Sequence, residues 1–311
     1  MLKFIVRRIF WTIPVLLVVI FFTFMLMRQI GGNPFRQTER AVPEAVQRNL
    51  ERKFNVDKPW YLQYAYYVKG VVTFDLGPSL VVRGRDVNDI VKTHFPKSIE
   101  LGLYAFLFAL VVGVPLGMIA ALRHNSAVDY SAMIVSNIFH AVPSFLVATL
   151  LIYFFALQWG DFFNLPTSGW STWKHKILPS IALGFGPMAL FARLVRGTML
   201  ETLQQDYVRT ARAKGLRYRR VVGLHVLRNS LIPVITAAGP LLGFIITGSF
   251  VIEVIFNIPG IGQYYITAVN ARDFSVVMGL TVLLSVIVII ANLAVDILYG
   301  ILDPRTRDAR G

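Results

Sequence analysis

The sequence predicts an all-α, polytopic membrane protein with six transmembrane helices and a small external helical segment. Of its 311 residues, 55% are hydrophobic and 15% are charged, whereas a soluble domain has about 25% charged residues. The mean hydropathy of +0.60 agrees with the prediction of a membrane protein. In addition, six apolar stretches are each long enough to cross the roughly 30 Å of a bilayer's hydrocarbon core. These observations disfavour a soluble fold.

The predicted order begins with an N-terminal transmembrane helix at 1–30, followed by an external helical cap at 31–97 and a five-helix core at 98–311. The first apolar run has a basic start like a signal peptide, but it exceeds the usual length and lacks a small-residue cleavage site, so we expect it to remain a helix. The six predicted spans are about 9–28, 98–122, 132–157, 178–196, 230–254 and 276–301.

The distribution of Lys and Arg predicts the orientation of these spans. Sixteen basic residues lie in the short segments 1–8, 123–131, 193–229 and 302–311, against three (Lys174, Lys176 and Arg272) in 158–177 and 255–275. Cytoplasmic loops carry the excess of Lys and Arg, and a connection as long as 31–97 is exempt from the rule. We therefore expect both termini and the 193–229 loop to face the cytoplasm.

The external segment carries helix signals. Pro43 suits a first helical turn, and Val46, Leu50 and Phe54 then share one face. An aromatic-rich run follows at 60–72, and Asp86 is placed to cap a third short helix whose Val87, Ile90 and Val91 share a face.

Aromatic side chains gather in the predicted outer segments. Those at positions 60, 61, 64, 66 and 67 are typical either of an interfacial aromatic belt or of a surface that receives a soluble partner. Trp170 and Trp173 in the second outer loop are interpreted as membrane-surface anchors.

Small residues and prolines interrupt several spans. Gly113 and Gly117, and Gly239 and Gly243, have the spacing that lets helices touch closely. Gly184, Gly186 and Pro187 are expected to interrupt the fourth span. Both observations fit ordinary packing and kinks, and they also fit a substrate path beside a bent helix.

Catalytic and metal-binding chemistry is missing from the sequence. There is no cysteine, no phosphate-binding loop, no His-Glu-x-x-His and no Gly-x-Ser-x-Gly, and the five histidines are scattered. We therefore expect no enzyme, no metal and no cofactor in this chain. The net charge of +14 fits topogenic loops better than nucleic-acid binding. Ionisable groups are scarce deep in the spans, and His140 fits a packed, hydrogen-bonded histidine better than a proton relay.

The stretch 207–229 has seven basic residues, no acid, and glycines at 215 and 223. It predicts two short helices joined at Gly215, where glycine permits a positive φ. The helix before this glycine is expected to be small on one side, with Ala211 and Ala213, and basic on the other. Such a piece either docks into a groove of another protein or lies on anionic headgroups.

Several motifs along the chain then point to a family. Ala211–Leu216, followed by Leu227–Pro233, resembles the cytoplasmic signature loop of the binding-protein-dependent ABC importer permeases of the dipeptide, oligopeptide and nickel group. The chain is most similar to the oligopeptide permease subunit with the long first external loop. The remaining matching pieces, in order, are Met1–Arg8, Lys58–Trp60 with Gln63 and Tyr64, Asp75–Ser79, Gly248–Glu253, Pro259–Gly262 and Leu302–Arg305.

One departure from the general importer signature supports the subgroup. Only Ala211 and Gly215 fit its first part, and His225–Arg228 stands where Ile-x-Leu-Pro is expected, with the proline later at Pro233. This variant is usual in the peptide and nickel group.

The resemblance implies an oligopeptide importer permease in a bacterial inner membrane. Its implied partners are a homologous second permease, two cytoplasmic ATPase subunits that bind ATP and Mg, an external peptide-binding protein and the lipid membrane, without nucleic acid. Dipeptide, nickel chelate or haem cargo remains an alternative, as does a stand-alone ion-driven carrier or channel.

The resemblance also implies candidate sites. The resemblance implies that the cytoplasmic coupling loop at 197–229 contacts the ATPases. The coupling residues are Tyr207, Thr210, Ala211, Arg212, Ala213, Lys214, Gly215 and Leu216. Polarity within the spans suggests five residues that line the path, namely Asn137, His140, Ser144, Ser249 and Asn292.

Overall fold

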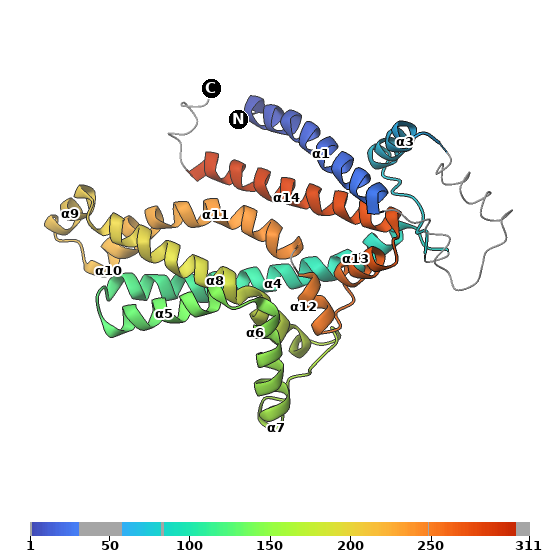
Figure 1. Ribbon diagram of the computed structural model, residues 1–311. Coiled ribbons are helices and arrows are strands. Elements are labelled where there is room, and N and C mark those ends of the chain that lie inside the picture. Colours follow the sequence, from blue (N-terminus) through green and yellow to red (C-terminus); the bar gives the residue numbers. More distant parts are fainter. Residues whose placement is uncertain (1, 31–57, 82–83, 248, 303–311) are drawn as a thin grey trace. The chain divides into compact units, whose positions relative to one another are not determined.

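The computed structural model describes residues 2–30, 58–81, 84–247 and 249–302. Within these ranges every regular element is a helix, which confirms the all-α prediction (Figure 1). The chain divides into two compact units. Unit 1 comprises residues 99–258 and 290–311, and unit 2 comprises residues 2–98 and 259–289.

Unit 2 holds the N-terminal helix and the segments that pack with it. Its elements are α1 (Leu2–Ile30), α3 (Trp60–Val72), the start of α4 (Val87–Leu122), α13 (Ile261–Asn270) and the start of α14 (Phe274–Leu302).

Unit 1 holds the remaining helices. They are the rest of α4, α5 (Ala127–Ala141), α6 (Ser144–Leu151), the π-helix η2 (Ile152–Gln158), α7 (Gly160–Phe163), α8 (Trp173–Leu203), α9 (Asp206–Ala213), α10 (Tyr218–Arg220), the π-helix η3 (Val221–Leu227), α11 (Arg228–Thr247), α12 (Phe250–Ile255) and the end of α14.

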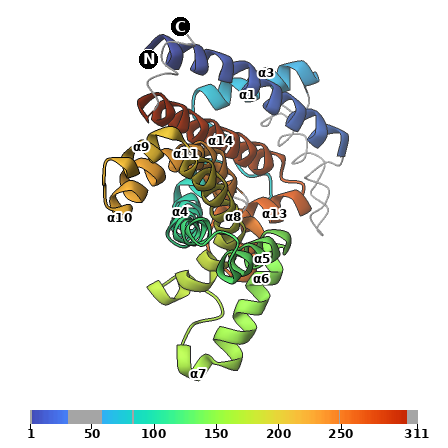
Figure 2. The ribbon, with the colours of Figure 1, turned by 90° about the vertical axis from the view of Figure 1, so that its left-hand side faces the viewer.

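Five helical stretches in the described ranges are long and apolar enough to cross a membrane. A sixth stretch of this kind, α5 followed by α6–η2, is bent by 105° at Val142–Pro143, the geometry of a broken span or of a re-entrant loop. The predicted span 132–157 is therefore not continuous. Val142 (φ −77°, ψ 125°) and Pro143 (φ −58°, ψ 139°) are both extended, because the proline ring disfavours helical backbone at the residue before it. Figure 2 shows α6 leaving the direction of α5.

Two other sequence-based expectations are wrong. The short helix expected after Asp86 is simply the first part of α4, which runs unbroken from Val87 to Leu122. The fourth span is not interrupted, since α8 continues through Pro179 and Pro187. Gly184 serves close packing instead, because a Cβ there would lie 2.6 Å from the Ala105 carbonyl oxygen of α4. The expectations for Pro43, Val46, Leu50 and Phe54 lie outside the described residues.

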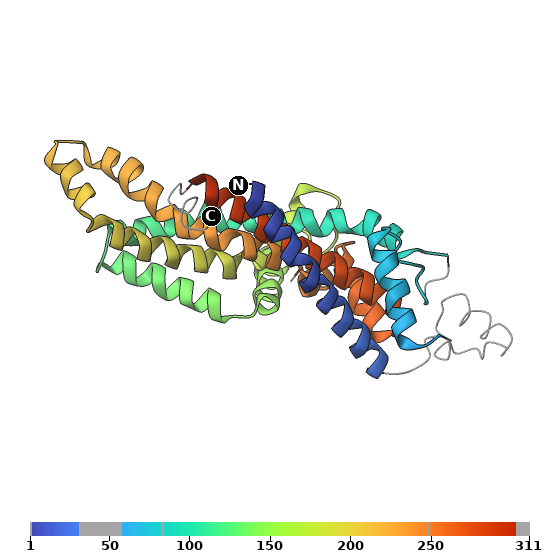
Figure 3. The same ribbon diagram turned by 90° about the horizontal axis from the view of Figure 1, so that it is seen from above.

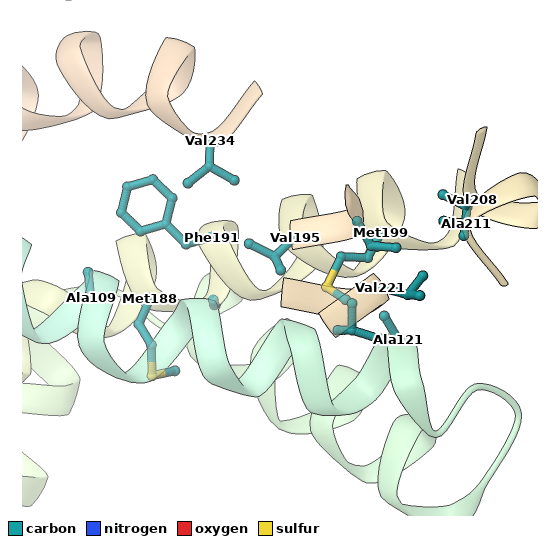
Figure 4. Packing of buried hydrophobic residues seen from close by; sticks show 13 residues of the cluster. Ala109, Ala121, Met188, Phe191, Val195, Met199, Val208, Ala211, Val221 and Val234 are labelled. Carbon is teal, nitrogen blue, oxygen red and sulfur yellow. The ribbon is translucent and has the colours of Figure 1, made fainter. Parts of the chain in front are cut away.

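The core of unit 1 forms around α8. Phe191, Val195 and Met199 on this helix pack with Ala109 and Ala121 of α4, as Figure 4 shows. Val208, Ala211, Val221 and Val234 belong to the same cluster. Gly113 and Gly117 let α4 approach the α8 backbone, with a Cβ at Gly113 only 2.5 Å from the Met188 carbonyl oxygen. The first Gly-x-x-x-Gly pair is therefore a helix-packing contact.

Unit 2 is held by side chains that reach between distant segments. Tyr64 of α3 donates a hydrogen bond to the Leu17 carbonyl of α1 (3.0 Å) and packs edge-on against Phe21, with ring centroids 5.6 Å apart. Asp273, buried before α14, accepts hydrogen bonds from the Ser79 hydroxyl and from the amide of Leu80 (3.1 Å). These contacts fix α3 and the loop after it within the unit.

The α4–α8 contact leads to a stability prediction. Gly117→Ala puts a methyl group against the Ala192 carbonyl and the Val195 side chain, so we expect the free energy of unfolding to fall by about 1–3 kcal/mol. Gly197→Ala is the matched control, because a Cβ there meets nothing within 4 Å. Thermal unfolding of the detergent-solubilised proteins measures the difference. Equal midpoints for the two variants would contradict this contact.

Candidate functional site

The 206–220 segment, which we call the elbow, consists of α9, a turn at Gly215 and α10. Gly215 has φ +76°, a conformation that side chains disfavour. Its amide donates to the Arg212 carbonyl (2.9 Å), and the Leu216 amide reaches the Ala211 carbonyl (3.4 Å). This closes the end of α9 in the manner of a glycine C-cap. The predicted turn at Gly215 and the short helix before it are confirmed, whereas the helix after the turn is not short, since α10 runs directly into η3 and α11.

Internal contacts anchor one face of the elbow. Val208 and Ala211 are buried in the unit 1 core, and Leu216 packs against it. Tyr207 accepts a hydrogen bond from the Asn229 amide of α11 (2.9 Å). The Thr210 hydroxyl donates back to the Asp206 carbonyl (2.9 Å), within α9 itself. The elbow is therefore packed against the ends of α8 and α11 along this face.

The other face of the elbow is exposed and basic. Arg209, Arg212, Ala213 and Lys214 are all exposed. Asp206 is the acid of α9, and it forms an exposed ion pair with Arg209 (3.7 Å), a kind of contact that contributes about 0–1 kcal/mol. Such a surface suits an acidic groove or anionic headgroups.

Ala211 and Ala213 do not share a face. Ala211 is 6% exposed and points into the core, whereas Ala213 is exposed. Two residues that are two positions apart on a helix lie on nearly opposite sides. A partner that docks on α9 can therefore reach Ala213, Arg212 and Lys214, while Ala211 supports them from beneath.

A cavity of about 380 Å³ lies at the break between α5 and α6. His140 and Ser144, two of the predicted path residues, line it on either side of Pro143. Most of the remaining wall is apolar and comes from α8 and α11. Phe139 and Phe185 also line it and stack face to face, with centroids 4.1 Å apart and planes 10° apart.

The other three predicted path residues lie elsewhere. Asn137 is exposed and accepts a long hydrogen bond from Arg193 (3.5 Å). Ser249 is fully buried and donates to Glu253 within α12 and its cap (2.5 Å). Asn292 is half-buried on α14. Polarity alone thus found two cavity residues and missed the stacked phenylalanines, although the X-Pro step at 142–143 marks the place.

Trp170 has a different role from the membrane anchor that its position suggested. It is 8% exposed, and its indole N–H donates to Glu100 of α4 (2.8 Å). Lys176 of α8 forms an ion pair with the same carboxylate. Trp173, in contrast, is 68% exposed, as an anchor would be. The Glu100 cluster ties the loop before α8 to α4.

Among the residues that the structure describes, no group of three or more His, Asp or Glu side chains is arranged to hold a metal ion. The elbow offers an exposed basic surface, and the cavity offers a mostly apolar wall.

Comparison with protein-family models identifies the chain. Residues 113–308 match the family described as binding-protein-dependent transport system inner membrane component. Residues 1–101 match the corresponding N-terminal membrane component family. The chain belongs to this transport family. The resemblance drawn from the elbow motif is confirmed.

Individual proteins agree with the family assignment. The chain is 46% identical to the dipeptide transport system permease protein DppB of Bacillus subtilis, over 99% of this chain and 98% of that protein. It is 43% identical to the oligopeptide transport system permease protein OppB of Haemophilus influenzae, over 99% of this chain and all of that protein. An inward-facing structure of the MetNI methionine ABC transporter has the same fold, with a TM-score of 0.58 and 19% identity over 69% of this chain and 96% of that chain.

The two faces of α9 lead to a matched pair of substitutions. Ala211→Asp forces a carboxylate into the apolar core of unit 1, so we expect it to lower the free energy of unfolding by about 3 kcal/mol or more. Ala213→Asp places the same group in solvent, and we expect the unfolding midpoint to stay near that of the parent. A parental midpoint for Ala211→Asp in a thermal melt would show that α9 does not pack as described.

Proposed function

We propose that this chain is a permease subunit of an ATP-driven peptide importer in a bacterial inner membrane. The observation that carries the proposal is the elbow, which is anchored on one face and exposes a basic surface on the other. Family membership supports the use of this elbow as a docking piece. The names of the relatives support peptide cargo over a nickel chelate or haem, and they include both dipeptide and oligopeptide systems.

In the proposed assembly, this chain supplies half of the path and pairs with a homologous permease. Two cytoplasmic ATPase subunits bind ATP and Mg and perform the hydrolysis, and an external binding protein delivers the peptide. This chain needs no cofactor of its own. Its Thr210, Arg212, Ala213 and Lys214 form the exposed coupling surface. Tyr207, Ala211 and Leu216 support this surface from the anchored face, and Gly215 forms the turn.

The mechanism follows from the two sites. Closure of the ATPases on ATP pushes the elbow, and the helices joined to it shift between an inward-open and an outward-open arrangement. The side of the membrane from which the wall beside His140 and Ser144 is accessible then changes. Few strong polar groups line this wall, which supports a passage that releases peptide easily, with the affinity residing in the external receptor.

The proposed orientation places both termini and the elbow in the cytoplasm. Because the sequence has no cysteine, single introduced thiols report position without background. We expect a membrane-impermeant maleimide to label Ala213→Cys in inside-out vesicles from cells that lack the ATPase subunits, but not in intact spheroplasts. Ser168→Cys, in the loop before α8, is the opposite-side control. Labelling of Ala213→Cys from outside would reject the orientation and the docking role together.

The coupling role is tested by Gly215→Val. A β-branched residue at φ +76° costs about 1–3 kcal/mol of local strain, so the turn rearranges while the buried helices remain. We expect co-purification of the ATPases and ATP-dependent peptide uptake in proteoliposomes to be lost. Lys92→Glu, an exposed charge reversal far from the elbow in sequence, is expected to leave both unchanged.

The same reconstitution separates the competing classes of transporter. Parental values of uptake and co-purification for Gly215→Val would refute the docking role. Gradient-driven flux through this chain alone, without ATPase subunits, would favour a stand-alone carrier or channel.

A further inference from the structure

We infer that Asp129 and Arg196 are the positioning pair that ties α5 to α8, so that a movement of the elbow carries both helices together to the cavity. The inference rests on the proposed function, because it concerns how the motion of a partner ATPase reaches the path. It assigns a role to two residues outside both the elbow and the cavity.

The pair has a restrictive geometry. Asp129, in the first turn of α5, is fully buried. The Arg196 Nε donates to its Oδ1 (2.5 Å) and the Nη2 donates to its Oδ2 (2.8 Å). The Asn125 amide also donates to this carboxylate (3.1 Å), so the turn between α4 and α5 is included. A guanidinium fork that meets a carboxylate in this way fixes both distance and direction.

On the elbow side, Arg196 lies two residues before a hydrogen-bonded block that begins at Thr198. It lies seven residues before the end of α8, or roughly 10 Å along a helix. Thr198 donates to the Ser230 carbonyl (2.9 Å), and Ser230 donates to the Thr202 hydroxyl (3.2 Å). These bonds join the end of α8 to the start of α11. Figures 1 and 3 show the elbow and the α4–α5 turn at the same end of unit 1.

On the cavity side, α5 connects the ion pair to the path, because the same helix holds Asp129 and the cavity residue His140. From Asp129 to His140 the helix advances roughly 16 Å, and Phe139 stacks there on Phe185 of α8. The ring stack and the other apolar contacts of α5 tolerate sliding of one helix along the other. A bidentate ion pair whose carboxylate is fully buried does not tolerate such sliding. The best-attested use of such a pair is to specify register rather than to add stability. The pair is therefore suited to keep α5 in step with α8.

The first arm of the test is Asp129→Asn in the complete transporter, reconstituted with its ATPases and binding protein. We expect this variant to assemble and hydrolyse ATP, while peptide uptake per ATP hydrolysed falls about tenfold. Arg196→Lys, which keeps the charge but loses the fork, is expected to show a smaller loss in the same ratio. Arg193→Gln is the matched control on α8, because its α5 contact is long and exposed, and its ratio should equal the parental one.

The second arm restores the link covalently. In the cysteine-free chain, Asp129→Cys with Arg196→Cys should show the loss, and a bis-methanethiosulfonate cross-linker between the two thiols should return uptake per ATP to near the parental value. A reductant should remove the gain in the same sample. This comparison decides the question even where Asp129→Asn assembles poorly.

The outcomes separate the inference from the proposed function. A parental ratio for Asp129→Asn, or a cross-link that leaves uptake low or abolishes it, would overturn the inference, because α5 would then move independently of α8. Absence of ATP-dependent peptide uptake from the parent complex would instead contradict the proposed function.

Discussion

The arrangement of unit 1 depends on how closely neighbouring helices approach the backbone of α8. Glycines at 113, 117 and 184 leave no room for a Cβ where α4 and α8 meet. Between helices in lipid, apolar side chains gain little from leaving one hydrocarbon environment for another, so close van der Waals contact at small residues has to hold them. The rest of the unit is built on this seam, because the core residues that receive the elbow lie along the same helix.

Polar contacts add register to this close packing. Arg196 and Lys176 lie near opposite ends of α8 and pair with carboxylates on α5 and α4. Each of these ion pairs joins two different helices, unlike the exposed pair within α9. Buried or half-buried ion pairs are scarce in apolar helices because desolvation is costly. The pairs that are present fix the axial register of one helix against the next. The position of the elbow is fixed in turn, because it is attached to these helices.

The sequence predicted the local features well. Apolar length located the five continuous spans and the bent α5–α6 stretch, and glycine chemistry located the turn at Gly215, because both signals reside in adjacent residues. It did not predict the break at Val142–Pro143 as a sharp bend, since hydropathy averages over the run and carries no direction. The sequence also did not predict which side chains meet across distant segments. Trp170 has the composition signal of an interface anchor, yet its indole N–H finds a partner 70 residues away on Glu100.

The same limit explains the candidate site. Ala211 and Ala213 look equivalent in sequence, and only the packing of α9 separates them. Asp129 and Arg196 are 67 residues apart, and no motif connects them. Polarity selected Ser249 for the path, but a hydroxyl in a span can equally satisfy a buried carboxylate, which is what it does beside Glu253.

The bend of 105° at Pro143 has a chemical consequence for the cavity beside it. Where a helix stops, its last carbonyls and the first amides of the next helix lose their usual intrahelical partners. Within a bilayer such main-chain groups are tolerated only where protein or water surrounds them. Unpaired peptide groups at the break therefore add hydrogen-bonding capacity to a wall near His140 that is otherwise mostly apolar. Hydrogen-bonding capacity of this kind does not depend on which side chains are present, so it persists in a lining of phenylalanine and leucine.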